Sequence, residues 1–498
     1  MRPDFRTVTP ILIAAALAAG LGSCARRAPS ALERLHPCAI DEGPTDAYCG
    51  KLAVWEDRQK QAGRKIDLKI IAMPALRRDP RADPVFVFAG GPGQGAAKIA
   101  DTISPIFRRL QDSRDLIFID QRGTGDSHPL ECKGPENESD DLALLSAEAP
   151  AKRFQDCLAK YDANPRLYTT PVAMDDIDEV RRFLGYGQIN LWGGSYGTRA
   201  ALVFLRRHPG SVRTVTLDGV APTDMRLPLY FARDSQRALS LLIRDCEADS
   251  GCSKRFPDLG AKADRILARL ATSPRMTLTH PRTGERTEVP LSRDAVATIL
   301  MSALYSPQLS ALLPKLIDNA AEGDFQGLLA LAFAGEGAES GGLAQGMFLS
   351  VACAEDFSRI GAGEGAEAAK GTFLGDFMLR TRMKPCAYWP AGEIGEEYYK
   401  PVVSDKPVLI LSGEVDPVTP PSWAEHVAQH LKNSKSIVVP GAGHGTSGVG
   451  CVPKLIAAFI EAGSAAALDT ACVAKAHRPP FFVTNAGPES AAPKEAAK

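Results

Sequence analysis

The chain of 498 residues has almost no net charge, few histidines and no two cysteines at the C-x-x-C spacing. Its 58 lysines and arginines balance 59 acidic residues, so no basic excess indicates binding to nucleic acid. It has eight histidines in no cluster and no C-x-x-C pair, so no metal site is indicated. The glycine run at 90–95 lacks the Gly-Lys-Ser/Thr ending of a phosphate-binding loop. We therefore predict no cofactor.

The chain also lacks a long hydrophobic run. The apolar stretch Ile11–Leu21 is shorter than the roughly 20 residues that cross a bilayer, so a permanent membrane helix is the weaker interpretation. Two arginines precede it, which predicts a signal peptide over residues 1–23. Leu21-Gly22-Ser23-Cys24 resembles a bacterial lipobox, so we expect Cys24 to be lipidated and to tether the protein to the membrane. With alanine at 25 rather than aspartate, the predicted location is the periplasmic side of the outer membrane. The alternative is an ordinary signal peptide and a soluble periplasmic or secreted protein.

The other ten cysteines form an even set, which suits an exported protein with disulfides. Buried free thiols are the alternative, but they are typical of cytosolic proteins. The hypothesis of nearest-neighbour pairing gives five local disulfides: Cys38 with Cys49, Cys132 with Cys157, Cys246 with Cys252, Cys353 with Cys386, and Cys451 with Cys472.

Short apolar runs alternate with helical patterns through much of the chain. Runs that are apolar at nearly every position indicate strands buried on both faces of a mainly parallel sheet, so we predict α/β architecture. The predicted strands are Leu68–Ala72, Val85–Phe88, Leu116–Ile119, Ile189–Trp192, Val212–Leu217, Val408–Leu411 and Ser436–Val439.

Between Asp218 and Lys406 the strand signals give way to helical patterns, which predicts a mostly helical cap over the carboxyl edge of the sheet. The glycine-rich stretches 335–346 and 361–371 are predicted to be loops. The expected organisation is a tether at 24–36, α/β segments at 37–218 and 407–484, a cap at 219–406 and a disordered tail at 485–498.

Ser195 is the candidate nucleophile. It lies in Gly193-Gly194-Ser195-Tyr196-Gly197, between the predicted strand Ile189–Trp192 and the helical stretch Thr198–Arg207. A serine on a strained strand-to-helix turn requires small neighbours two residues away on each side. The motif therefore indicates a nucleophile elbow.

A serine nucleophile needs a histidine base and a carboxylate that orients it. His444 lies in a glycine-rich loop after a predicted strand, and Asp416 follows the strand Val408–Leu411. The order Ser, Asp, His is that of the α/β-hydrolases. Asp218 and, more weakly, Glu414 are rival acids, and a turn-capping aspartate with a solvent-facing histidine is the non-catalytic alternative.

The tetrahedral intermediate of acyl transfer needs two oxyanion donors. One is expected to be the backbone N–H of Tyr196, directly after the nucleophile. The other is expected from the glycine loop after Val85–Phe88, where Gly91 is the candidate.

These motifs together resemble the prolyl and tripeptidyl aminopeptidase family of α/β-hydrolases. The resemblance rests on the segments 89–93, 120–127, 193–198 and 217–219 with those of Asp416 and His444, and it is faint in the cap. It implies an α/β-hydrolase fold and the removal of N-terminal residues or short peptides, with acidic cap groups binding the free amine. Glu355 and then Asp356 are the candidates for that role; a solvated surface pair is the alternative. Ala89 departs from the histidine often found before this glycine run.

The predicted function is therefore an exported serine aminopeptidase acting on short peptides. The same three residues would serve an esterase or amidase with a non-peptide substrate, because a fold does not fix a substrate. A non-catalytic binding lipoprotein is a third alternative. The sequence leaves open the oligomeric state, any proline preference, and whether one residue or three are released.

Overall fold

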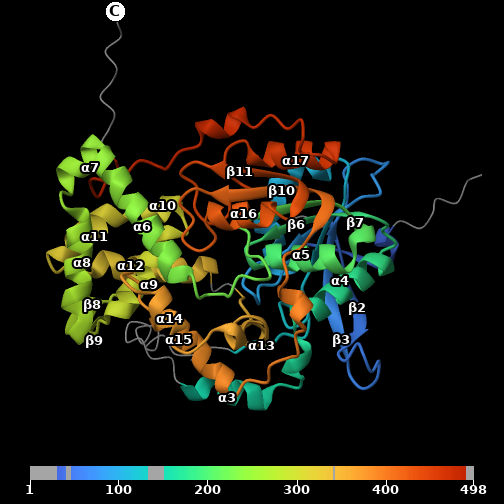
Figure 1. The fold of residues 1–498 in the computed structure, drawn as a ribbon, viewed down its shortest axis with the longest axis horizontal. Helices are drawn as coiled ribbons and strands as arrows, with labels where there is room; N and C mark the ends of the chain where they lie inside the picture. Colours follow the sequence, from blue (N-terminus) through green and yellow to red (C-terminus); the bar gives the residue numbers. More distant parts are fainter. Residues whose placement is uncertain (1–30, 41–45, 133–150, 340–341, 489–498) are drawn as a thin grey trace, which may run out of the picture.

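The computed structural model describes residues 31–40, 46–132, 151–339 and 342–488. The signal peptide, Cys24 and residues 489–498 lie outside these ranges, so those predictions are untested. Nine strands form one sheet in the order β1-β2-β3-β5-β4-β6-β7-β10-β11, which is parallel from β5 to β11 and antiparallel at the β1 end (Figure 1).

Every predicted strand is present in this sheet. Two strands were not predicted, because β1 is three residues long with a proline and the apolar residues of β2 are interrupted by Gly50 and Lys51. Both strands lie at the antiparallel end of the sheet, where they are only partly buried. The strands are β1 (His36–Cys38), β2 (Ala47–Trp55), β3 (Lys65–Met73), β4 (Val85–Phe88), β5 (Leu116–Ile119), β6 (Ile189–Gly194), β7 (Val212–Asp218), β10 (Ser404–Gly413) and β11 (Leu431–Val439).

Helices cover both faces of the sheet, each over its own apolar core. Helices α4 (Thr170–Phe183), α5 (Tyr196–Arg207) and α16 (Pro421–Ala428) pack on one face, where Leu191 and Ile410 are fully buried. On the other face α17 (Val452–Ala462) packs with the short helices α1 (Ala100–Ile103) and α2 (Arg108–Gln111). This three-layer arrangement is the α/β-hydrolase architecture that the sequence predicts.

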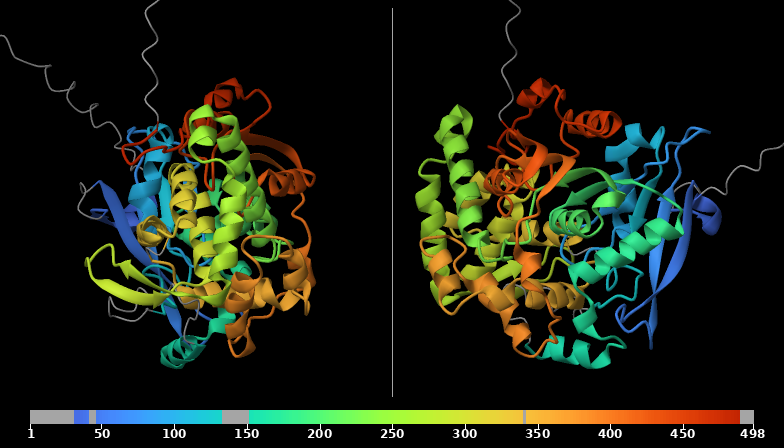
Figure 2. Two further views of the ribbon diagram at one scale, coloured as in Figure 1. Left: turned by 90° about the vertical axis from the view of Figure 1, so that its left-hand side faces the viewer. Right: turned by 45° about the vertical axis from the view of Figure 1, so that its right-hand side comes forward.

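The cap forms a separate helical body beside the sheet (Figures 1 and 2). It has its own core, and it includes one hairpin, β8 (Arg275–Thr279) with β9 (Arg286–Pro290), that was not predicted. Its helices are α6 (Phe231–Ala248), α7 (Ser250–Arg255), α8 (Leu259–Arg269), α9 (Arg293–Leu304), α10 (Pro307–Ser310), α11 (Leu313–Ala321), α12 (Gln326–Glu339), α13 (Gln345–Glu355), α14 (Glu364–Ala368) and α15 (Phe377–Met383).

The boundaries differ from the prediction in four places. The chain is folded from Ala31, because Leu32 and Leu35 are buried in the sheet core, so the tether cannot extend to residue 36. Helix α3 (Ala151–Lys160) precedes the predicted cap but packs against α13. Parts of both glycine-rich stretches are helical, in α12, α13 and α14, because alanines and glutamates, which favour helices, separate many of the glycines. Residues 485–488, assigned to the tail, close a turn onto Thr484.

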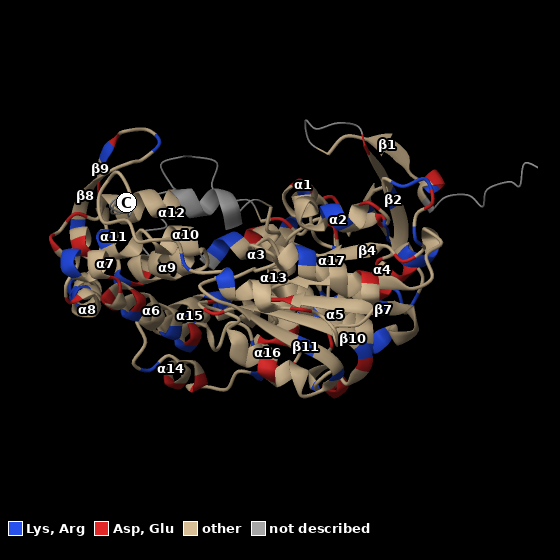
Figure 3. Ribbon diagram, turned by 90° about the horizontal axis from the view of Figure 1, so that it is seen from above, with Lys and Arg blue, Asp and Glu red and all other residues tan. Residues whose placement is uncertain are grey.

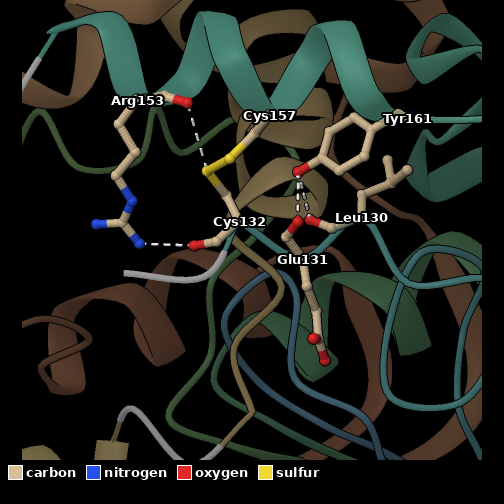
Figure 4. Close-up of a disulfide and its surroundings, with 6 residues drawn as sticks. All are labelled: Leu130, Glu131, Cys132, Arg153, Cys157 and Tyr161. Carbon is tan, nitrogen blue, oxygen red and sulfur yellow. Dashed lines mark hydrogen bonds between the residues drawn. A yellow bond between two sulfur atoms is a disulfide. The ribbon is translucent and has the colours of Figure 1, made fainter. Parts of the chain in front are cut away.

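All five predicted disulfides are present. Three of them brace the cap, including the Cys132–Cys157 bond that fastens α3 to the chain leaving the sheet (Figure 4). Acidic and basic residues intermingle along the ribbon in the view from above (Figure 3). Among the described residues, no helix is long and apolar enough to cross a membrane.

Candidate active site

Ser195 occupies a strained turn between β6 and α5. Its φ of 55° and ψ of −125° lie where a residue with a side chain is rarely found. A Cβ on Gly193 would come within 2.2 Å of the Gly197 carbonyl oxygen, and one on Gly197 within 2.1 Å of the Phe88 carbonyl oxygen. Both flanking glycines are therefore required by close backbone approach, as the motif predicts for a nucleophile elbow.

The elbow is fixed by hydrogen bonds to the end of β7. The backbone N–H of Ser195 donates to the Asp218 carbonyl oxygen at 2.9 Å. The Thr198 hydroxyl donates to the Ser195 carbonyl oxygen at 2.6 Å and accepts from the Ala221 N–H at 2.8 Å. These hydrogen bonds stabilise the strained backbone conformation of Ser195, which the chain would otherwise rarely adopt.

His444 and Asp416 meet on the loops after β11 and β10. The ring Nδ1 of His444 lies 2.8 Å from Oδ2 of Asp416. The other carboxylate oxygen, Oδ1, accepts the backbone N–H groups of Val418 at 2.9 Å and Thr419 at 2.8 Å. The Thr419 hydroxyl also donates to Oδ2. The turn after Asp416 therefore sets the direction in which its carboxylate faces the imidazole.

The surroundings of Asp416 favour its charged form. The side chain is fully buried, which on its own would raise the pKa, but the charge and hydrogen bond of His444 and the two backbone N–H groups outweigh burial and hold the pKa of Asp416 below its ordinary value. An ionised Asp416 keeps the proton of His444 on Nδ1. That leaves Nε2 able to accept a proton.

A cap residue, Tyr305, supports the histidine loop from the other side. Its carbonyl oxygen accepts the backbone N–H of His444 at 2.9 Å, and the two rings pack edge to face with centroids 5.1 Å apart. Sequence reasoning missed Tyr305, because a tyrosine after a cap helix carries no motif. The cap thus contributes directly to the position of the candidate base.

The two rival acids have other partners. The Asp218 carboxylate accepts the backbone N–H groups of Thr446 and Ser447 and the Thr446 hydroxyl, at 2.7 to 2.9 Å. It therefore anchors the chain just after His444. Glu414 accepts the Gly441 N–H at 2.9 Å and fixes the start of the same loop. Of the three acids, Asp416 is the one that forms the ion pair with His444.

A cavity of about 420 Å³ joins these residues under the cap. Ser195, His444 and Thr419 line it on the sheet side, and Gly91 and Tyr196, the predicted oxyanion donors, line it beside them. A Cβ on Gly90 would lie 3.3 Å from the Ser195 Cβ, so the glycine loop passes directly against the nucleophile. The apolar wall comes mainly from Phe154, Leu227, Phe231, Leu343, Phe348 and Leu349.

Glu355 and Asp356 do not line this cavity. Both are fully buried at the end of α13. Glu355 accepts the backbone N–H of Thr170 at 2.7 Å and its hydroxyl at 2.8 Å, while Asp356 accepts two hydrogen bonds from Arg199 at 2.8 and 3.0 Å. Burial is the main cause that raises the pKa of Glu355. Their place in the structure thus differs from the predicted amine site: Glu355 joins the cap to α4 through Thr170, and Asp356 joins it to α5 through Arg199.

Two family models match the chain, in keeping with this geometry. Residues 83–294 match the model described as "alpha/beta hydrolase fold", and residues 371–472 match the one described as "TAP-like protein". The chain is an α/β-hydrolase. The two matches cover both sheet segments that carry Ser195, Asp416 and His444.

Curated relatives of this hydrolase include proteins named as peptidases. Serine protease Hip1 of Mycobacterium tuberculosis is 27% identical over 467 residues, which cover 84% of this chain and 86% of that protein. Tripeptidyl aminopeptidase of Streptomyces coelicolor is 24% identical, covering 91% and 88%. Among solved structures, proline iminopeptidase of Mycobacterium smegmatis is 18% identical with a TM-score of 0.41, covering 83% of this chain and 98% of its own. The chain thus has the α/β-hydrolase fold and is similar to peptidases over most of its length.

Proposed function

We propose that the protein is a serine aminopeptidase that cleaves short peptides near their free N-terminus through an acyl-enzyme. The observation that carries this proposal is the cavity that joins Ser195 to His444, with His444 held by Asp416 at 2.8 Å. Such a constellation suits acyl transfer.

In the proposed reaction, Oγ of Ser195 attacks the scissile carbonyl carbon while His444 takes its proton. The backbone N–H groups of Gly91 and Tyr196 bind the oxyanion. As the C–N bond breaks, His444 gives the proton to the leaving amine, and water then attacks the acyl-enzyme by the same steps. Loss of one oxyanion donor would cost about 100- to 1,000-fold in turnover.

The preference for short peptides is supported by the cap. The cavity lies beneath helices α3, α6, α13 and α15, and its volume is of the size that encloses a small ligand rather than an extended chain. Similarity over nearly the whole chain to a protein named tripeptidyl aminopeptidase supports release from the N-terminus. We propose no cofactor for this reaction.

Export is part of the proposal. Five disulfides suit a protein that folds in an oxidising compartment. We propose that the signal peptide is removed and that lipid on Cys24 holds the enzyme at the periplasmic side of the outer membrane. Mass spectrometry of the mature protein tests this: a lipid-modified Cys24 at the N-terminus supports it, and a start at any other residue contradicts it.

A second candidate, an esterase or amidase with a non-peptide substrate, is favoured by one observation. None of the described residues that line the cavity is an aspartate or glutamate, so none of them offers a carboxylate to a substrate ammonium. Turnover of aminoacyl- and tripeptidyl-arylamides should be compared with that of their N-acetylated forms and of short acyl esters. Preference for free N-termini supports the aminopeptidase, whereas preference for blocked amides or esters supports the second candidate.

A further inference from the structure

The catalytic cavity has one permanently charged side chain among its described lining residues, and that charge is positive. It is Arg382, near the end of α15 in the cap. Its guanidinium carbon lies 5.5 Å from the ring centroid of Phe348, which lines the same cavity from α13. The aromatic face therefore supports the guanidinium from one side.

A second arginine packs against another residue of the cavity wall. Arg153 on α3 has its guanidinium carbon 5.6 Å from the ring of Phe154, another cavity residue. Its Nη2 donates to the Cys132 carbonyl oxygen at 2.6 Å, beside the Cys132–Cys157 disulfide (Figure 4). Its Nε is buried without a hydrogen-bond partner among the described residues, and burial lowers the pKa of Arg153. Its positive charge is therefore poorly compensated in the described structure.

Helix α3 is held firmly in this position. The disulfide closes it onto the segment after the sheet, and the Tyr161 hydroxyl donates to the carbonyl oxygens of Leu130 at 3.1 Å and Glu131 at 2.9 Å. The helix also packs against α13 and the turn Lys384–Ala387 that follows α15. The two arginines therefore belong to one braced wall, which need not rearrange to bind a ligand.

A cation beside an apolar cavity selects the charge of the ligand. A substrate carboxylate would accept hydrogen bonds from the planar guanidinium fork of Arg382, and the positive wall would favour that carboxylate over an uncharged group. We propose that this wall binds a carboxylate of the substrate, with Arg382 making the contact and Arg153 adding positive potential. The enzyme thus prefers anionic short peptides. This specificity rests on the peptidase function proposed above.

The carboxylate has two sources in a short peptide, the free C-terminus or an acidic side chain. We would measure kcat/KM on matched peptides that carry either a C-terminal carboxylate or amide, and either glutamate, glutamine or lysine at each position. Arg382→Gln removes the charge, and Arg382→Lys keeps it without the fork. Arg380→Gln is the control, because Arg380 lies on the same helix and pairs with Asp376 outside the cavity.

The wild type is expected to prefer one class of carboxylate peptide over its neutral match by tenfold or more. Arg382→Gln should reduce that ratio to near one, Arg382→Lys should retain part of it, and Arg380→Gln should retain all of it. Equal rates for charged and neutral peptides in the wild type, or an unchanged ratio in Arg382→Gln, overturn the proposal. If no peptide is cleaved, the peptidase proposal fails instead, and the same ratio measured on carboxylate-bearing and neutral esters decides the role of Arg382.

Discussion

Replacing Asp416 by asparagine separates it from its rival, Asp218. In the wild type, Oδ1 of Asp416 accepts two backbone N–H groups while Oδ2 faces Nδ1 of His444. An asparagine must keep its carbonyl oxygen toward the two N–H groups, because its amide nitrogen cannot accept them. The amide nitrogen then faces Nδ1 of His444 and donates to it.

This forces the wrong tautomer on the histidine. With Nδ1 as acceptor, the proton sits on Nε2, the nitrogen that has to receive the proton of Ser195. The corresponding change in a Ser-His-Asp triad lowers kcat about 10,000-fold, a barrier increase of about 5 kcal/mol. We expect Asp416→Asn to lower kcat by this order with KM little changed.

Asp218→Asn is the matched control, since it alters a buried carboxylate that anchors the loop after His444. One N–H group loses its acceptor, which is expected to cost about 2 kcal/mol of stability and about tenfold in kcat. Both variants would be assayed by steady-state hydrolysis of an activated arylamide or ester, with circular dichroism to verify folding. A fall of less than tenfold for Asp416→Asn, or a larger fall for Asp218→Asn, would refute the assignment.

Three further predictions concern stability. Asp356→Asn leaves the buried Arg199 without its nearest charge partner and should cost about 3 kcal/mol in urea unfolding, whereas no loss would contradict the locking role. The double variant Cys132→Ser with Cys157→Ser opens a loop of 25 residues. It should lower the free energy of unfolding by about 3.5 kcal/mol in the chain-entropy model. An unchanged midpoint of urea unfolding would argue against that disulfide. Burial raises the pKa of Asp120 to about 6, so the folded state binds its proton more tightly than the unfolded state. The contribution of Asp120 to the free energy of unfolding is therefore fully present below about pH 4, where the carboxyl group is protonated in both states. It decreases as the pH rises and is lost above about pH 6. Relative to the wild type, Asp120→Asn should gain about 3 kcal/mol between these limits, and a pH-independent difference would contradict it.

The sheet was predictable because strands that are buried on both faces have apolar residues at nearly every position. Val85–Phe88 and Leu116–Ile119 are apolar at every position and form β4 and β5 with those same bounds. The elbow was predictable for a similar reason: steric crowding at Gly193 and Gly197 admits no side chain. The five disulfides agree with the hypothesis that each cysteine pairs with its neighbour in the sequence.

The cap was predictable only as a helical body. Its contacts with the sheet depend on long-range packing that no local pattern records, so the support of His444 by Tyr305 was missed. The position of the acidic pair at the end of α13, outside the lining of the cavity, could not be predicted for the same reason. The sequence around an acidic residue next to a cysteine does not show whether its carboxylate faces a ligand or accepts hydrogen bonds within the protein. Glu355 accepts hydrogen bonds from Thr170.

Labelling with a fluorophosphonate tests the central claim, that Ser195 is a nucleophile activated by His444, most directly. The reagent is attacked only by an activated serine, and peptide mapping by mass spectrometry identifies the modified residue. We predict a single adduct on the peptide that contains Ser195, its loss in Ser195→Ala, and much slower labelling in His444→Ala. An adduct on another serine, or equal labelling of wild type and Ser195→Ala, would contradict the claim.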